Sequence, residues 1–221
     1  MPIPKKSDVA APKSAKIRVF EALRDWIIDG TLQPGEKLLD GEISQYFSVS
    51  RTPVREAMQM LAEQKLIEVF PGRESRVSSI DIINIPETYR MLAELHALAV
   101  DFAYDKITES DIAALRKANE RFLKSHKNRD IAGCREHDKE FHDIFIGLAG
   151  NDFLTSFCDT LNGHAARIEN AYFTKVSDME DLISEHNEII AALEAHDPAR
   201  AREFMRANWL HTPEVIGVIK E

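Results

Sequence analysis

Four polar side chains with the chemistry of metal ligands interrupt apolar helical stripes in the C-terminal part of the chain. Asp138 and His142 are four residues apart beside a stripe of core residues, so they share one helix face and can reach one ligand. His186 and Asn208 each stand at an inward position of a later stripe. A single inward histidine is usually a hydrogen-bonded core residue, but an Asp, two His and an Asn from three helices all need partners. A divalent metal ion would satisfy them, because imidazole nitrogens and side-chain oxygens are its usual ligands.

The same donor set leaves two alternatives open. An Asp/His/His site can be catalytic, as in a metal-dependent hydrolase, which requires a base or nucleophile nearby. The chain has no His-Glu-x-x-His motif, and Glu185 and Glu188 are only general candidates for such a base. In the other alternative, the polar residues form a hydrogen-bond network that binds no metal.

The elements that must position these residues are helices. From Ile82 onward the apolar residues recur at helical spacing without a credible strand pattern. The predicted helices span residues 82–104, 109–126, 130–149, 152–173, 178–195 and 198–210. Short turns join helices of this kind into an antiparallel bundle, in which ligand and metal sites lie between facing helices.

A second group of polar residues lies on a short helix predicted to begin near Ser50. One face of this helix carries an apolar stripe at positions i, i+3, i+4 and i+7, formed by Val54, Ala57, Met58 and Leu61. The helix start and another face carry the side chains that could contact DNA, namely Ser50, Arg51, Thr52, Arg55 and Gln59. Helix N-termini bind phosphates and arginines recognise base edges, so this helix suits a DNA duplex.

The neighbours of this helix have the spacing of a winged helix–turn–helix. Helices predicted at 15–29 and 40–47 precede it, the second with Ile43, Tyr46 and Phe47 facing inward. Strands predicted at 66–70 and 75–79 follow it as a hairpin. Arg73 and Arg76, at or near the tip of this wing, are candidates for contacts with backbone phosphates or the minor groove.

Composition and charge restrict the class of protein. The 221 residues carry a net charge of −9, and no apolar run approaches the ~20 residues of a membrane helix. Residues 1–79 contain 12 Lys+Arg and 11 Asp+Glu, whereas the remainder contains 16 and 26, so clustered arginines at one end join an acidic body. Residues 1–14 lack the apolar core of a signal peptide and are expected to form a mobile arm. The two cysteines form no CxxC spacing, and the expected location is a reducing compartment, the cytoplasm.

Residues 32–77 resemble the winged helix of GntR-type bacterial regulators. The matching motifs are Leu-x-Pro-Gly-x-x-Leu from Leu32, Val-Ser-Arg-Thr-Pro-Val-Arg-Glu-Ala from Val49, and Pro71-x-Arg73 in the wing. The chain departs from the family at Glu74, where a glycine usually follows the wing arginine.

The C-terminal part resembles the FadR-type effector domain of these regulators, and its six helices are closer to the VanR-like branch. The matching motifs are Asp138-x-x-Phe-His142, a following Gly-Asn pair, and Glu185-His186-x-x-Ile. Metal-binding members use one Asp and three His, and the position of the last His is Asn208 here. His211, one turn later, is a possible substitute for it.

Three arginines are candidates for binding the carboxylate of an effector. Arg135 precedes Asp138 by three residues and shares its helix face. Arg90 matches a family position that often faces the pocket, and Arg167 on the fourth predicted helix of the bundle is the third candidate.

Residues and resemblance together predict a mainly α fold. It consists of a winged helix–turn–helix at 15–79 and an antiparallel all-helical bundle for effector binding and dimerisation at 80–221, with 78–84 as the link. The implied function is a bacterial transcription regulator, commonly a repressor, and not an enzyme or a membrane protein. It would bind a palindromic operator as a homodimer and sense a small carboxylic acid at a divalent metal ion, zinc first, with nickel or manganese as alternatives.

Overall fold

The computed structural model describes residues 14–70, 74–81, 84–172 and 179–215. Two compact units divide the chain, Met1–Ser79 and Ile80–Glu221. Of the predicted arm, residues 1–13 lie outside the described residues. Ser14 is the N-cap of the first helix, where its hydroxyl accepts a hydrogen bond from the Ile17 backbone N–H.

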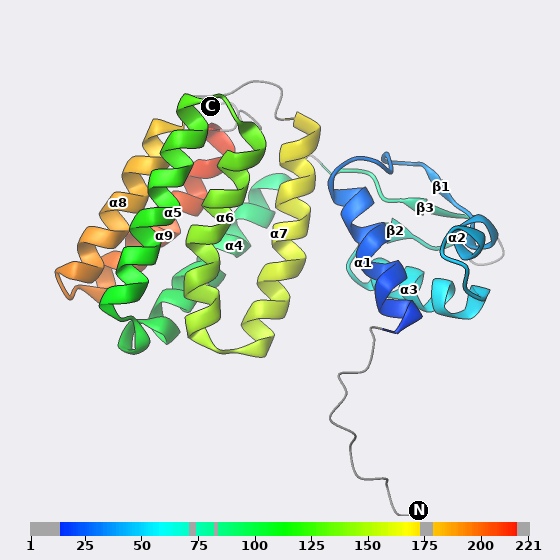
Figure 1. Ribbon diagram of the computed structural model, residues 1–221, viewed down its shortest axis with the longest axis horizontal. Coiled ribbons are helices and arrows are strands. Elements are labelled where there is room, and N and C mark those ends of the chain that lie inside the picture. The colour runs from blue at the N-terminus through cyan, green and yellow to red at the C-terminus, as the bar shows by residue number, and fades with distance from the viewer. Residues whose placement is uncertain (1–13, 71–73, 82–83, 173–178, 216–221) are drawn as a thin grey trace, which may run out of the picture. The chain divides into compact units, whose positions relative to one another are not determined.

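The N-terminal unit combines three helices with a small antiparallel sheet (Figure 1). Its elements are α1 (Ala15–Ile28), β1 (Lys37–Leu38), α2 (Asp40–Tyr46), α3 (Arg51–Glu63), β2 (Ile67–Glu68) and β3 (Ser75–Val77). The strand order is β1-β3-β2. The sequence pattern predicted only the β2–β3 hairpin, because β1 is two residues long and acquires its strand character from pairing with Arg76 and Ser75.

The core of this unit confirms the apolar stripe predicted for α3. Its members Val54, Ala57, Met58 and Leu61 are all buried, and they form one cluster with Val19, Leu23 and Ile27 of α1. Burial of this stripe leaves the opposite face of α3 exposed to solvent.

One inward residue of α2 was predicted wrongly. Tyr46 is 72% exposed, and its ring lies edge-on to Trp26 at 5.4 Å and to Phe47 at 5.0 Å. The buried residue of α2 is Ser44. Positions two residues apart point to nearly opposite sides of a helix, so burial of Ser44 turns Tyr46 outward.

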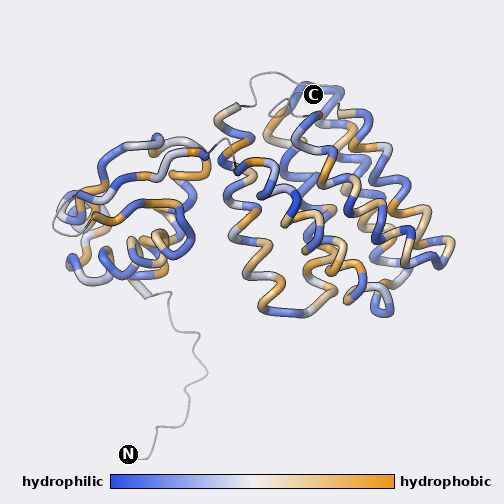
Figure 2. Tube along the Cα trace, turned by 180° about the vertical axis from the view of Figure 1, so that it is seen from behind, coloured by the Kyte–Doolittle hydropathy of each residue, from blue (hydrophilic) through white to orange (hydrophobic). Residues whose placement is uncertain are grey.

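The C-terminal unit is a bundle of helices whose apolar residues recur along each turn (Figures 1 and 2). Its elements are α4 (Ile85–Ala103), the short 3-10 helix η2 (Tyr104–Lys106), α5 (Glu109–Lys127), α6 (Ile131–Ala149), α7 (Asp152–Tyr172), α8 (Glu180–Glu194) and α9 (Pro198–Val215). The last helix continues through Pro213 to Val215, five residues beyond its predicted end at residue 210. A mainly α fold with an N-terminal winged helix–turn–helix is thus confirmed.

Packing in the bundle places α4, α6, α8 and α9 around a common interior. Helix α4 packs on α6, α7 and α9, and α8 packs on α5 and α9. Among the described helices, none combines the length and apolar character that crossing a membrane would require.

Candidate metal centre and nucleic-acid interface

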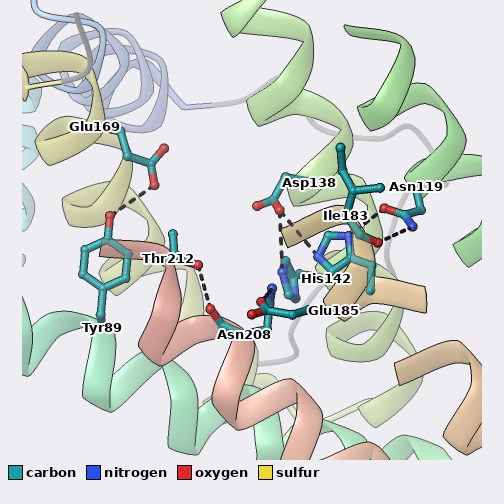
Figure 3. A network of polar contacts seen from close by, with 10 residues as sticks. Tyr89, Asn119, Asp138, His142, Glu169, Ile183, Glu185, Asn208 and Thr212 are labelled. Carbon is teal, nitrogen blue, oxygen red and sulfur yellow. Dashed lines mark hydrogen bonds and ion pairs between the residues drawn. The ribbon is translucent and has the colours of Figure 1, made fainter. Parts of the chain in front are cut away.

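Three of the four candidate metal ligands converge in the interior of the bundle (Figure 3). The Asp138 Oδ1 atom on α6 lies 3.6 Å from the His186 Nε2 atom on α8 and 3.9 Å from the His142 Nε2 atom. Potential ligand atoms of the three residues all lie within 4.8 Å of one another. Both histidines are buried, whereas 32% of the Asp138 side chain remains exposed. This group could therefore hold a metal ion and remain accessible from one side.

A hydrogen-bond network determines which nitrogen of His186 carries the proton. The Asn119 side chain on α5 donates through Nδ2 to the Ile183 carbonyl and to Asn187 Oδ1, both at 3.0 Å. The Asn119 Oδ1 atom therefore accepts from His186 Nδ1, which is 3.1 Å away. The bare Nε2 atom of His186 then faces the carboxyl group of Asp138. Two acceptors at this distance require a proton or a cation between them.

Burial shifts the pKa values of all three residues. It raises the pKa of Asp138 to about 8, with a further contribution from the charge of Glu169. Burial lowers the pKa of His142 to about 3, against the opposing effect of the Asn208 side chain. Burial also lowers the pKa of His186 well below its usual value, and the neighbouring His142 adds to this effect. Two neutral imidazoles and one carboxyl group that holds a proton in place of a cation form a donor set that fits a divalent metal.

The fourth candidate, Asn208 on α9, is buried beside His142. Its Nδ2 atom donates to Glu185 Oε2 at 2.8 Å, which directs its Oδ1 atom away from Glu185. That Oδ1 atom makes no hydrogen bond of good geometry with the described residues. The alternative ligand His211 binds the other oxygen of Glu185 through Nδ1 at 2.7 Å. Glu185 thus holds His211 and orients Asn208, and Asn208 is the one that approaches His142.

The three candidate effector arginines have different surroundings. Arg135 is one turn before Asp138 on α6, its Nε atom is 3.7 Å from Glu169 Oε2, and its guanidinium also donates to Asn170. Arg167 is buried on α7, and burial lowers its pKa. The side chain of Arg90 is 63% exposed and pairs with Glu87 at 3.2 Å, so its role in effector binding stays a prediction.

Two further residues of this interior were missed in the sequence. His96 on α4 is fully buried, with its ring stacked on Trp209 at 4.5 Å and edge-on to His142 at 5.1 Å. The inward position of His96 could have been predicted, because it lies four residues after Leu92 and four before Val100 in the inward stripe of α4. Glu169 on α7 was the other omission; it accepts a hydrogen bond from the Tyr89 hydroxyl at 3.2 Å.

The predicted DNA-binding side chains of α3 all lie on its exposed side. They are Ser50, Arg51, Thr52, Arg55 and Gln59. Ser50 is the N-cap residue, although its side chain makes no capping hydrogen bond. Asp40, the first residue of α2, pairs with Arg55 at 2.6 Å and lies 4.0 Å from Arg51. The hydrogen bond from Arg55 lowers the pKa of Asp40, so this carboxylate is charged and holds the arginines of the exposed face.

In the wing, Arg76 is held by its neighbours. This residue lies within β3, inside the predicted strand 75–79, and its guanidinium donates to the Gly35 carbonyl at 3.0 Å and pairs with Glu74. Glu74 also pairs with Lys37 at 2.8 Å, which ties β3 to β1. The other wing candidate, Arg73, lies outside the described residues.

Comparison with known proteins agrees with both units. A model of the family described as "Bacterial regulatory proteins, gntR family" matches residues 16–77, and a model of the FCD domain, the FadR/VanR-like C-terminal domain, matches residues 87–210. The transcriptional regulator YdhC of Bacillus subtilis is 25% identical over 213 residues, covering 95% of this chain and 94% of that protein. The transcriptional repressor RspR of Escherichia coli is 26% identical over 204 residues, covering 92% and 90%.

Solved structures show the same fold. That of Escherichia coli McbR/YncC has a TM-score of 0.77 at 20% sequence identity and covers 93% of this chain and 98% of its own. The family and these relatives are transcription regulators and not enzymes, which overturns the alternative of a metal-dependent hydrolase. The chain belongs to the GntR family of bacterial regulatory proteins, with a winged helix–turn–helix followed by an FCD domain.

Proposed function

We propose that this regulator senses a small carboxylic acid at a divalent metal ion held by Asp138, His142, His186 and Asn208. The observation that carries the proposal is the pair of facing acceptors, Asp138 Oδ1 and His186 Nε2, 3.6 Å apart. Because the one proton of the neutral His186 ring is on Nδ1 and is donated to Asn119, the Nε2 atom cannot donate to the Asp138 carboxylate. Either the proton that Asp138 holds in the metal-free protein or a cation relieves this conflict, and we infer that the cation is zinc, which suits two imidazoles with oxygen ligands, with nickel or manganese as alternatives.

The site also suits an acid as the effector. Such a metal supplies a Lewis-acidic position at which a carboxylate oxygen can bind beside the protein ligands. Arg135 lies on α6, one turn before Asp138, and Arg167 is buried on the neighbouring helix α7. Both guanidinium groups match carboxylate geometry, so we assign them to the organic part of the effector.

The DNA-binding part of the proposal rests on the exposed face of α3. We assign Arg51, Arg55 and Gln59 to base or phosphate contacts, with Ser50 and Thr52 at the helix start. Arg76, and Arg73 beyond the described residues, are assigned to the phosphate backbone beside the wing. A family of helix–turn–helix regulators acts on DNA in the bacterial cytoplasm, and we place this chain there with its relatives.

Dimerisation is supported by exposed apolar side chains on two neighbouring helices. On α4 these are Met91, Leu98 and Phe102, and on α7 they are Phe153 and Phe157. The helices pack together, and Lys106 after α4 donates to the carbonyls of Leu148 and Ala149 before α7, so the end of α4 lies close to the start of α7. We assign this α4/α7 face to a second copy of the chain, since a two-fold axis matches a palindromic operator.

Effector binding would act on DNA by changing the relative placement of two DNA-binding units in the dimer. A ligand shifts such an equilibrium only through its different affinity for the two arrangements. Repression relieved by the acid is the proposed direction, and it agrees with the printed description of RspR as a repressor.

The test is metal analysis of the untagged protein together with one matched pair of variants. We expect bound metal in the wild type, and we expect His186→Ala to lose the metal and the acid response while retaining operator binding. His137→Ala is the control, because this histidine lies on α6 but pairs with Glu140 outside the cluster. A wild type without metal, and without a rise in melting temperature on addition of zinc, nickel or manganese, would show that the cluster is a metal-free network.

A further inference from the structure

We propose that His96 is a positioning residue for the metal site, which accepts the Nδ1 proton of His142 and so orients that ligand. This inference rests on the proposed function, because it concerns the second nitrogen of a metal-binding histidine. It adds a residue from α4 to a site otherwise built on α6, α8 and α9.

The two histidine ligands differ in how their second nitrogen is satisfied. Nδ1 of His186 has Asn119 as an acceptor, as metal-binding histidines normally require. Nδ1 of His142 is buried and makes no hydrogen bond with any residue that the structure describes. The site therefore lacks one outer partner, and that partner must come from the surroundings of His142.

The rings around His142 leave one suitable acceptor. Phe141 has no polar atom, and Trp209 can only donate through its indole nitrogen. His186 uses Nδ1 for Asn119 and directs Nε2 at Asp138. His96 lies edge-on to His142 at 5.1 Å, and neither of its ring nitrogens makes a hydrogen bond within the described part of the chain.

The amide oxygen of Asn208 is the other acceptor near His142. In the proposed site that oxygen is a ligand of the metal, so it is not available to the Nδ1 proton. A neutral imidazole carries one bare nitrogen, and burial lowers the pKa of His96 well below its usual value. His96 can therefore accept the proton directly, by a small rotation of either ring, or through one buried water.

This role has opposite consequences for folding and for metal binding. In the metal-free protein none of the described residues forms a hydrogen bond with the buried ring of His96, and an unsatisfied polar group of this kind costs free energy. Replacing it with leucine should keep or raise the melting temperature of the metal-free protein. The same change should weaken metal binding by about 10- to 100-fold, the usual effect of losing an outer-shell partner.

The experiment compares His96→Leu, His96→Gln and Asn119→Leu, with chelator-treated protein. Thermal scans give the melting temperature, and calorimetric competition with a chelator gives zinc affinity. His96→Gln keeps an acceptor and should restore most of the affinity lost in His96→Leu. Asn119→Leu is the matched control: it should lower both quantities, because Asn119 makes three hydrogen bonds with described residues.

The outcomes separate this inference from the proposed function. Wild-type zinc affinity in His96→Leu, or an equal loss in His96→Gln and His96→Leu, would overturn the role of His96 and leave the metal site intact. A lower melting temperature without a change in affinity would make His96 an ordinary core residue. A wild type that binds no metal would overturn both.

Discussion

Asp138, whose side chain is 32% exposed, is the residue on which the chemistry of the interior depends. It faces two neutral imidazoles, the charge of Glu169 acts on it, and Glu169 in turn lies 3.7 Å from Arg135. Without a cation, the Asp138 carboxyl group keeps its proton up to a pKa of about 8. Metal binding at neutral pH must therefore release that proton, so metal affinity should rise with pH.

Asp138→Asn should change how the stability of the metal-free protein depends on pH. The folded-state pKa of Asp138 is raised above its unfolded value, so its proton stabilises the fold at low pH, and this contribution is lost as pH rises towards 8. Solvent reduces this contribution of Asp138 to stability, because 32% of its side chain is exposed. We expect the variant to raise the melting temperature more at pH 8 than at pH 5. An equal change at both pH values in thermal scans would contradict a raised pKa.

Asn208→His tests the fourth ligand of the proposed metal site. An imidazole binds zinc more strongly than an amide oxygen, so the variant should raise zinc affinity in calorimetric competition. His211→Ala is the control, because His211 is held by Glu185 and should contribute little to affinity. If His211→Ala lowers zinc affinity and Asn208→His leaves it unchanged, His211 and not Asn208 completes the site.

At the scale of the element, helix α3 has two faces with separate tasks. Its buried stripe of Val54, Ala57, Met58 and Leu61 holds it on the core, while its exposed arginines remain available to DNA. Asp40 at the start of α2 links the helices of the motif by pairing with Arg55. Exposed pairs of this kind contribute little to folding, so their main effect concerns the position of the arginines.

Arg51→Ala and Arg55→Ala should each weaken operator binding by about 1–3 kcal/mol if these side chains contact base edges. Neither change touches the buried stripe, so the melting temperature and the oligomeric state should stay those of the wild type. Gel-shift titration at fixed salt measures the loss. Unchanged affinity in both variants would refute the assignment of α3 as the recognition helix.

Asp40→Asn should separate specific from non-specific DNA binding. Without the Asp40 carboxylate, Arg51 and Arg55 can pair with any DNA phosphate. Affinity for unrelated DNA should therefore rise and depend more steeply on salt concentration. Affinity for the operator should gain less or fall, because Arg55 loses its orientation. Glu63→Gln removes the same charge from the far end of α3 and should leave the ratio of operator affinity to affinity for unrelated DNA unchanged. An equal rise in affinity for the operator and for unrelated DNA would contradict a role of Asp40 in positioning Arg55.

At the scale of the whole molecule, the chain combines two units with different charge. The near-neutral DNA-binding unit carries clustered arginines, and the acidic bundle carries the buried site and the exposed α4/α7 face. In the proposed dimer, communication between effector and DNA passes through the assembly of two copies. The α4/α7 face can be mutated without changing the metal site or the DNA-binding face of α3.

Phe157→Glu should dissociate the dimer. Phe157 is 60% exposed in the single chain, so a charge there costs little in the monomer but opposes burial of this face against a second copy. Light scattering after gel filtration should show monomers, and the stronger binding of the wild type to a full palindrome than to a half-site should be lost. Glu180→Gln, on an exposed position of α8, is the control. A variant that remains dimeric would place the interface elsewhere.

Features that depend on spacing along the chain could be predicted from the sequence. Helix positions, the buried stripe of α3, and the shared face of Asp138 and His142 all follow from a period of 3.6 residues, and the GntR and FadR-type motifs were recognisable in the same segments. The extent of α9 and the outward turn of Tyr46 were missed, because periodicity identifies a face without saying which neighbour covers it.

Only the tertiary structure decided how the polar residues are paired. The proton on Nδ1 of His186 depends on Asn119, 67 residues earlier, and the orientation of Asn208 depends on Glu185, 23 residues earlier. His96 and His142 meet only because α4 packs on α6. The type of a residue determines which hydrogen bonds its side chain can make. Its actual partner lies on a helix that packs beside it only in the folded protein, so spacing along the chain cannot predict that contact.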